Sequence, residues 1–189
     1  MIEWSQKDRE VFVKEFPQID MKPYEAFALQ GWEHGKLHGL PHWQRVEKNG
    51  IFLSTKWRDG KLYVHKDIDI KVVRLFAYFH DKCRTDNGYD LKHGERAAQL
   101  VLELRDTLLK DLTDDQVSLL ERACRWHTTE QKTGILTIDT CFDADRLDLE
   151  RVGIVPAAQK MASTRGAYYA CHPKEFKRSI AELRNYLCI

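Results

Sequence analysis

Apolar residues recur at helical spacing in one segment after another of this 189-residue chain, and runs with the alternation of a strand are nearly absent. Because a helix buries one stripe of side chains every 3.6 residues, this pattern predicts an all-α fold. Hydrophobic residues make up 43% of the chain, which is enough to build a core. No Ser/Gly linker, low-complexity tract or repeat interrupts the pattern, so we expect one domain over residues 1–189.

Breakers and capping residues divide the pattern into helices. Thr113 and Gln116 have the spacing of a capping box, which predicts that a helix starts there. The Asp-Gly pair at 59–60 predicts a turn or a small hairpin. An amphipathic helix at 173–188 is expected to pack on the rest of the chain. The five helices that carry candidate site residues are expected at about 42–57, 70–82, 93–111, 113–127 and 143–153.

Charge and composition exclude several classes of protein. Thirty Lys and Arg residues against 29 Asp and Glu leave a formal charge of +1, so no uniform field exists to hold nucleic acid or an anionic membrane surface. No uncharged stretch approaches the roughly 20 apolar residues of a membrane-spanning helix. The first residues lack the apolar segment of a secretory signal, so we expect a cytoplasmic protein. Five widely spaced cysteines without a CxxC pair argue against disulfides and a thiolate zinc site.

Each of the five helices carries a histidine or an aspartate on its apolar stripe rather than on its polar face. One buried histidine is usually an ordinary core residue, but burying four imidazoles and two carboxylates without partners costs several kcal/mol per group. A divalent cation satisfies many of these groups at once, so the set predicts a metal site. The residues are His42, His80 followed by Asp81, His93, His127 and Asp145.

The adjacent pair His80 and Asp81 adds a geometric condition. Side chains one residue apart diverge by about 100° on a helix, so both can bind one ion only at a helix end or a bend. The turn-forming residues at 85–90 follow directly, and they make a helix end at this point plausible.

These residues stand in four segments with a familiar order, namely HGLPHWQRVEKNG, LFAYFHDKCR, HGERAA and DADRLDLERVG. Over about residues 30–155 the chain resembles the HD-domain metal-dependent phosphohydrolase superfamily. The resemblance implies a helical HD bundle whose core metal site is formed by His42, His80, Asp81 and Asp145. In the last segment Asp145 matches the family ligand, and Asp143 does not. Two imidazoles and two carboxylates suit one divalent ion such as Mn, Fe, Ni, Co or Mg, without naming which.

The resemblance also implies a reaction, in which a metal-bound water attacks a phosphoester of a nucleotide or a similar small phosphorylated molecule. His93 matches a histidine that stands beside the leaving group, so it is expected to act as general acid, with a structural role as the alternative. Asp81 is expected to act both as a metal ligand and as a catalytic residue. His127 is expected to touch phosphate, to orient a ligand or to bind a second metal.

Phosphate also requires positive charge near the metal. The candidates for binding substrate or supporting the ligands are Arg45, Lys82, Arg84 and Arg146, against the simpler interpretation that they are solvated helix-face charges. Arg165 is a further candidate for the mouth of the pocket, although the sequence does not predict where its side chain points. His34 and His38 are four residues apart, so they either form a second metal pair or belong to the segment that leads into His42. The residues are Arg45, Lys82, Arg84, Arg146, Arg165, His34 and His38.

Two other functions fit the same residues. An HD-fold di-iron oxygenase would use His93 and His127 as additional ligands, and a non-catalytic HD protein would bind nucleotide without turnover. The expected partner is a small phosphorylated substrate rather than a membrane or an extended nucleic acid, and an oligomer is compatible with the sequence. The substrate and the metal are not determined by these patterns.

Overall fold

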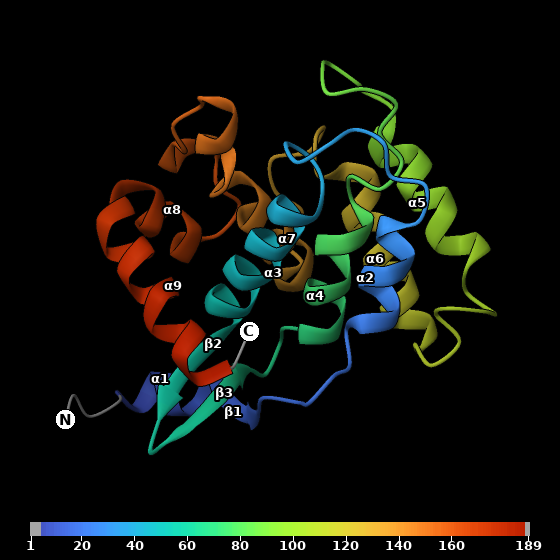
Figure 1. Cartoon of the computed structure of the whole chain (residues 1–189). Helices are drawn as coiled ribbons and strands as arrows, with labels where there is room; N and C mark the ends of the chain where they lie inside the picture. Colours follow the sequence, from blue (N-terminus) through green and yellow to red (C-terminus); the bar gives the residue numbers. More distant parts are fainter. Residues whose placement is uncertain (1–4, 188–189) are drawn as a thin grey trace.

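The structure is a computed structural model that describes residues 5–187, with side chains described as far as residue 183. The chain is mostly helical, as the periodicity predicts, and a small antiparallel sheet of three strands lies at one end of the helices (Figure 1). The all-α prediction is therefore correct for most of the chain and wrong for these short strands. The elements are α1 (Gln6–Val11), β1 (Phe12–Glu15), α2 (Lys22–Leu29), α3 (Leu40–Ser54), β2 (Thr55–Arg58), β3 (Lys61–His65), α4 (Ile70–Phe79), α5 (His93–Glu103), α6 (Asp114–Trp126), α7 (Leu136–Arg146), η1 (Leu149–Val152), η2 (Ala158–Lys160), α8 (Thr164–Cys171) and α9 (Pro173–Leu187).

The sheet is built around the predicted Asp-Gly turn. Asp59 and Gly60 both have positive φ angles, 49° and 75°, and they join β2 to β3 in an antiparallel hairpin. β1 pairs with the other edge of β3, which gives the strand order β1-β3-β2. Helix α3 ends at Ser54, before this hairpin, whereas the sequence pattern extended the helix to 57. In strands of four or five residues, the alternation of apolar and polar residues is too short to be distinguished from the helical spacing of the neighbouring segments.

Helix α4 lies at the centre of the bundle, between α3 and α7 on one side and α2 and α6 on the other (Figure 1). Nine of its ten side chains are buried, and only Lys71 is partly exposed. Asp69 caps its start by accepting hydrogen bonds from the backbone N–H groups of Lys71 and Val72. The predicted capping box at Thr113 and Gln116 is confirmed at the start of α6. These capping hydrogen bonds fix where α4 and α6 begin, and so fix the positions of the side chains along both helices.

Two predicted helices differ from the structure. Helix α5 ends at Glu103, and residues 104–112 form turns. Helix α7 begins at Leu136 and ends at Arg146, where the sequence pattern predicted one helix over 143–153. The chain bends at Leu147 and continues as η1, which ends at Val152. Gly153 follows as the C-cap with a left-handed φ of 78°, at the predicted stop. This bend turns residues 148–151 back toward α3.

The α8–α9 pair covers one side of α3 (Figure 1). Phe176 of α9 is buried against Phe52 of α3, with ring centroids 5.6 Å apart. Residue 188 of the helix predicted at 173–188 lies outside the described residues. No helix within 5–187 combines the length and the apolar composition that crossing a bilayer requires.

Candidate metal centre

Four of the predicted ligands converge in the middle of the bundle. Nε2 of His42, from α3, lies 3.1 Å from Nε2 of His80, which follows α4. The same His42 atom lies 3.4 Å from Oδ1 of Asp145, from α7, and 3.5 Å from Oδ2 of Asp81. Neighbouring ligands around one ion are about 3 Å apart when each lies about 2.1 Å from it. These four residues can therefore hold a divalent cation, and they are called here the first donor group.

The end of α4 allows both His80 and Asp81 to face this centre. Helix α4 ends at Phe79, and His80 is its C-cap. Asp81 lies in the turn that follows, where the N–H of Lys82 donates to the carbonyl of Phe79. The helix therefore ends three residues before the predicted residue 82. With the chain in a turn after His80, Nε2 of His80 and Oδ2 of Asp81 lie 3.7 Å apart.

Hydrogen bonds to Nδ1 orient both imidazoles of the first donor group. Nδ1–H of His42 donates to Oδ2 of Asp148 over 2.8 Å. Nδ1–H of His80 faces the carbonyl oxygens of Phe76 and Ala77 at 3.0 and 3.1 Å. A carbonyl or an ionised carboxylate only accepts, so each proton is on Nδ1 and each Nε2 carries a lone pair. Two lone pairs that face each other at 3.1 Å repel, and a cation between them would remove that repulsion.

A second donor group adjoins the first and shares Asp81 with it. Oδ1 of Asp81 lies 3.1 Å from Nε2 of His93 and 4.0 Å from Nε2 of His127, and the two Nε2 atoms are 2.9 Å apart. Both rings again donate Nδ1–H to backbone, His93 to the Asp90 carbonyl and His127 to the Cys124 carbonyl. Asp81 therefore directs one oxygen to each group, and the described residues provide two adjacent places for a cation.

Burial and charge put these groups in the protonation states that metal ligands need. Burial lowers the pKa of His80 to about 3 and also lowers the pKa of His127, so both rings are neutral at pH 7. Burial opposes ionisation of Asp145, but His80 and the guanidinium of Arg151 outweigh it and hold the pKa of Asp145 at about 2. Asp81 has its pKa held well below the usual value, because its imidazole neighbours likewise outweigh burial.

One atom of the first donor group is left without a hydrogen bond. Oδ1 of Asp145 is buried and accepts none from any described residue. Its ion-pair partners besides His42 are Arg151, at 3.7 Å, and His80, at 3.8 Å. A buried carboxylate oxygen without a partner is costly, and a cation bound by the donor group would remove that cost. The donor set therefore fits a divalent ion.

Arg45 and Asp148 support the ligand His42 from behind. Nε and Nη2 of Arg45 donate to the two oxygens of Asp148 over 2.6 and 3.0 Å. Asp148 in turn accepts from His42 on Oδ2. A carboxylate in this position fixes the ring of a ligand histidine and increases its basicity. Arg45 was expected either to bind substrate or to support the ligands, and its contacts in the structure are of the second kind.

Two arginines flank the donor groups. Arg84, a predicted candidate, has a side chain only 7% exposed, and its Nη1 lies 3.4 Å from both Oδ1 of Asp81 and Nδ1 of His93. Arg151 was not predicted, and its side chain is 10% exposed beside Asp145. The only sequence signal for Arg151 was its position in the DADRLDLERVG segment, and the bend after α7 is what brings it to the centre.

His38 is a further residue that the sequence did not single out for this role. Its Nδ1 lies 3.0 Å from Oδ2 of Asp81, so it donates to the shared carboxylate. His34 instead packs edge-on against Trp32, with ring centroids 5.2 Å apart, and belongs to neither donor group among the described residues. The two histidines thus do not form the second metal pair that was one of the two expectations.

Lys82 and Arg146 were expected near phosphate, and the structure places both elsewhere. The ammonium of Lys82 donates to the carbonyl of Gln30, because the turn after α4 directs this side chain toward α2. Nη1 of Arg146 donates to the carbonyls of Gln131 and Lys160 over 2.6 and 3.0 Å. Arg146 follows Asp145 directly on a helix, so its side chain leaves the axis about 100° away from the donor groups.

Arg165 and Asp143 also hold the fold together away from the donor groups. Nη2 of Arg165 donates to the carbonyl of Thr55 over 3.0 Å, beside the sheet. Asp143 accepts from the backbone N–H groups of Ala162 and Ser163 and so anchors the start of α8. The choice of Asp145 over Asp143 agrees with this geometry.

Comparisons with models of known protein families, with curated proteins and with solved structures find no match to this chain. The chemistry of the centre is therefore inferred from its own residues.

Proposed function

We propose that the chain is a metal-dependent phosphohydrolase that cleaves a phosphoester of a nucleotide or a similar small phosphorylated molecule, in an HD-type helical bundle. One observation carries the proposal. Nε2 of His42 lies 3.1 Å from Nε2 of His80, and each of these two nitrogens lies 3.4–3.8 Å from a carboxylate oxygen of Asp81 and of Asp145. Oδ1 of Asp145 has no hydrogen-bond partner among the described residues. A divalent ion supplies Lewis acidity, which lowers the pKa of water and polarises a phosphoryl group.

Arg84 and Arg151 supply the positive charge that a phosphorylated substrate needs. Each guanidinium is largely buried beside a donor group, and each is held in place by backbone carbonyls, Gly88 for Arg84 and Leu37 for Arg151. A planar guanidinium offers several N–H groups that match phosphate oxygens. Arg84, one of the predicted candidates, and Arg151 are therefore the proposed phosphate-binding side chains, and Lys82 and Arg146 are not.

His93 is the proposed general acid if the first donor group alone holds an ion. Its Nδ1–H is bonded to the Asp90 carbonyl, so a transferable proton would be on Nε2, within 3.1 Å of Oδ1 of Asp81. Asp81 would stabilise the protonated ring, which would then donate Nε2–H to the leaving oxygen. If Nε2 instead binds a second ion, His93 cannot serve as the acid, so the two roles exclude each other.

The di-iron oxygenase is the second candidate, and a specific observation favours it. Oδ2 of Asp81 lies 3.5 Å from Nε2 of His42 and its Oδ1 lies 3.1 Å from Nε2 of His93, which is a suitable arrangement for two transition-metal ions. The hydrolase and the oxygenase differ in the number of ions and in the requirement for O₂.

The test combines metal analysis with a reaction screen on protein purified without a histidine tag. Phosphate release from a panel of nucleotides is measured with Mn, Co, Ni and Mg, beside the metal content per chain. One ion per chain with metal-dependent release supports the hydrolase, and the His93→Gln variant should then keep its ion and lose release. Two irons, oxygen consumption and no release would overturn the hydrolase. A drop from two ions to one in His93→Gln would assign His93 to the second donor group.

A further inference from the structure

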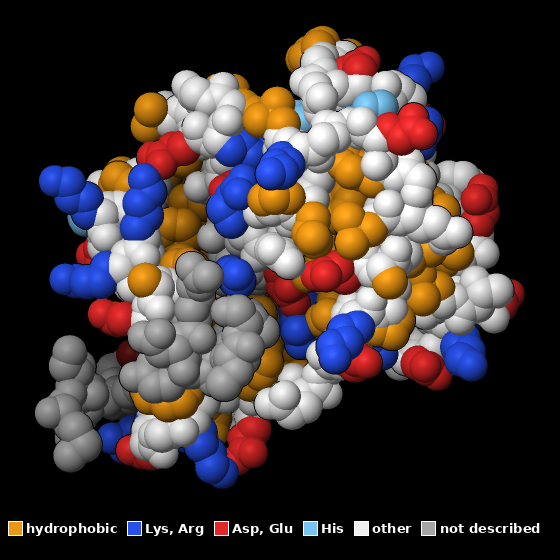
Figure 2. Space-filling model, viewed as in Figure 1, with side chains coloured by type: hydrophobic (Ala, Val, Ile, Leu, Met, Phe, Trp, Pro, Cys, Tyr) orange, Lys and Arg blue, Asp and Glu red, His pale blue; other side chains and the backbone are white. Residues whose placement is uncertain are grey.

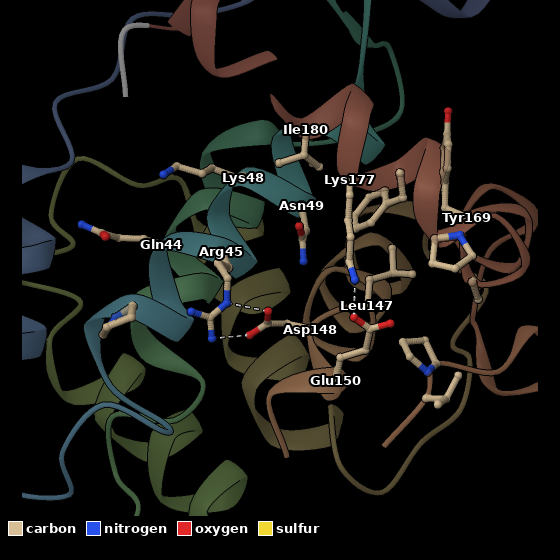
Figure 3. A pocket seen from close by; sticks show the side chains of 16 residues that line it. Gln44, Arg45, Lys48, Asn49, Leu147, Asp148, Glu150, Tyr169, Lys177 and Ile180 are labelled. Atoms are coloured by element: carbon tan, nitrogen blue, oxygen red, sulfur yellow. Dashed lines mark hydrogen bonds and ion pairs between the residues drawn. The ribbon is translucent and has the colours of Figure 1, made fainter. Parts of the chain in front are cut away.

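A cavity of about 400 Å³ lies beside the metal centre and includes none of the donor residues among those that line it (Figure 3). It is bounded by α3, by the segment that follows α7, and by α8 and α9. Apolar side chains bordered by Lys and Arg are visible on this face where α9 approaches α3 (Figure 2). Cavities of this size hold small organic molecules in many proteins.

The cavity has one apolar side and one polar side. Ala170, Phe176 and Ile180 from α8 and α9 contribute apolar surface. The opposite side carries the ion pair between Arg45 and Asp148, whose side chains face each other in the close-up (Figure 3). A molecule that fills this space therefore needs an apolar body and a polar head.

Hydrogen bonding determines the chemistry of that head. Nε and Nη2 of Arg45 are bonded to Asp148, but no described residue accepts from its Nη1, and the side chain is 44% exposed. Lys177 bonds to Glu150 over 2.6 Å and is 68% exposed, which leaves further N–H donors toward solvent. Both oxygens of Asp148 are already occupied, by Arg45 and His42. The polar side thus has donors to spare, and an anionic head would satisfy them.

The same ion pair connects the cavity to the first donor group. Asp148 accepts from Arg45 on the cavity side and from Nδ1–H of His42 on the other, and Nε2 of His42 faces the cation position. An anion bound at Nη1 of Arg45 offsets part of the guanidinium charge that acts on Asp148, so Asp148 accepts more strongly from His42. A stronger acceptor at Nδ1 makes Nε2 a better ligand.

We infer that this cavity binds a small amphipathic anion, a carboxylate or sulfonate with an apolar body, and that the bound anion increases the cation affinity of the first donor group. The binding is independent of the proposed function, whereas the coupling rests on it. The ligand acts from outside the donor groups, so it is an effector rather than a substrate.

Binding is tested with 8-anilinonaphthalene-1-sulfonate fluorescence and its displacement by decanoate. Ala170→Trp fills the cavity and should weaken binding at least tenfold. Lys177→Gln removes a positive charge at an exposed position and should leave the fold intact. It should weaken binding about twofold to fivefold, the effect of one solvent-exposed ion pair. Lys174→Gln is the matched control, because Lys174 is exposed on the same helix and does not line the cavity.

Two results would overturn the binding. One is probe fluorescence that decanoate does not displace from the wild-type chain. The other is equal affinity in Lys177→Gln and Lys174→Gln. Membrane lipids offer the same chemistry, so co-sedimentation with phosphatidylglycerol vesicles that Ala170→Trp abolishes would identify a lipid as the source of the anion.

Coupling is tested by titrating Mn²⁺ with and without saturating decanoate. We expect the Mn²⁺ affinity to rise about fivefold or more, the lower end of usual coupling between sites. Mn²⁺ affinity that saturating decanoate leaves unchanged would refute the coupling. A chain that binds the probe and no metal would refute the proposed function and leave the binding in place.

Discussion

Replacing Asp81 with asparagine tests the central feature of the metal centre. The substitution keeps the shape of the side chain and removes the charge that the two donor groups share. An asparagine oxygen still accepts the hydrogen bond from His38, so the metal-free protein should remain folded. The expected loss is therefore in cation affinity rather than in folding.

The magnitude follows from the distances. A divalent ion about 3 Å from a unit negative charge is attracted by about 11 kcal/mol at an effective dielectric constant of about 20. Dehydration offsets most of this attraction, and a remaining quarter, about 3 kcal/mol, corresponds to a roughly 100-fold weaker Kd. At a cation concentration about 1,000 times the wild-type Kd, the stabilisation by binding falls from about 4 kcal/mol to about 1.4 kcal/mol. For a chain of this length, the metal-dependent rise in Tm falls from about 8–16 °C to about 3–6 °C.

The assay is thermal unfolding with EDTA and with added Mn²⁺, beside metal content after desalting. Asp106→Asn is the matched control, because the Asp106 side chain is 96% exposed and away from both donor groups. The control should behave as the wild type in both measurements. An Asp81→Asn variant with the wild-type rise in Tm and the wild-type metal content would show that the cation does not bind where the donor groups converge.

Three further predictions test the surroundings of the centre. Asp148→Asn should weaken cation affinity about 10- to 100-fold by loosening the hold on His42, and isothermal titration that gives the wild-type Kd would contradict this role. Arg146→Gln loses hydrogen bonds to backbone carbonyls, so it should lower the free energy of unfolding, measured in urea, by about 1–3 kcal/mol. An altered Mn²⁺ affinity in this variant would show that Arg146 acts at the metal centre after all. The pKa of His80 is about 3 in the folded chain and 6.5 as its ordinary value, so the unfolded state binds the extra proton as pH falls below 6.5. The metal-free protein should therefore lose about 1.4 kcal/mol of stability between pH 7.5 and pH 5.5, and urea midpoints that coincide at the two pH values would refute this.

Much of the local structure was predictable, because it depends on neighbouring residues. The capping box at Thr113 and Gln116 and the turn at residues 59–60 both follow from short-range hydrogen bonding and backbone geometry. Periodicity also placed histidines and aspartates on buried stripes, which is where the structure has them. The ends of α5 and α7 were not predictable in this way, because apolar spacing continues past the residue where tertiary contacts stop each helix.

By itself, the sequence determined a mostly helical chain with histidines and aspartates turned inward, since helical spacing and capping act over a few residues. Only the tertiary structure decided that Asp81 serves two donor groups, and that Arg84 and Arg151 rather than Lys82 and Arg146 lie beside them. A long charged side chain ends several bonds from the backbone, so the acceptors that distant segments bring within reach determine its direction. The acceptors for these arginines and for Lys82 come within reach only because the chain bends after α7 and because α4 ends beside α2. The spacing of residues within one segment predicts neither of these two contacts.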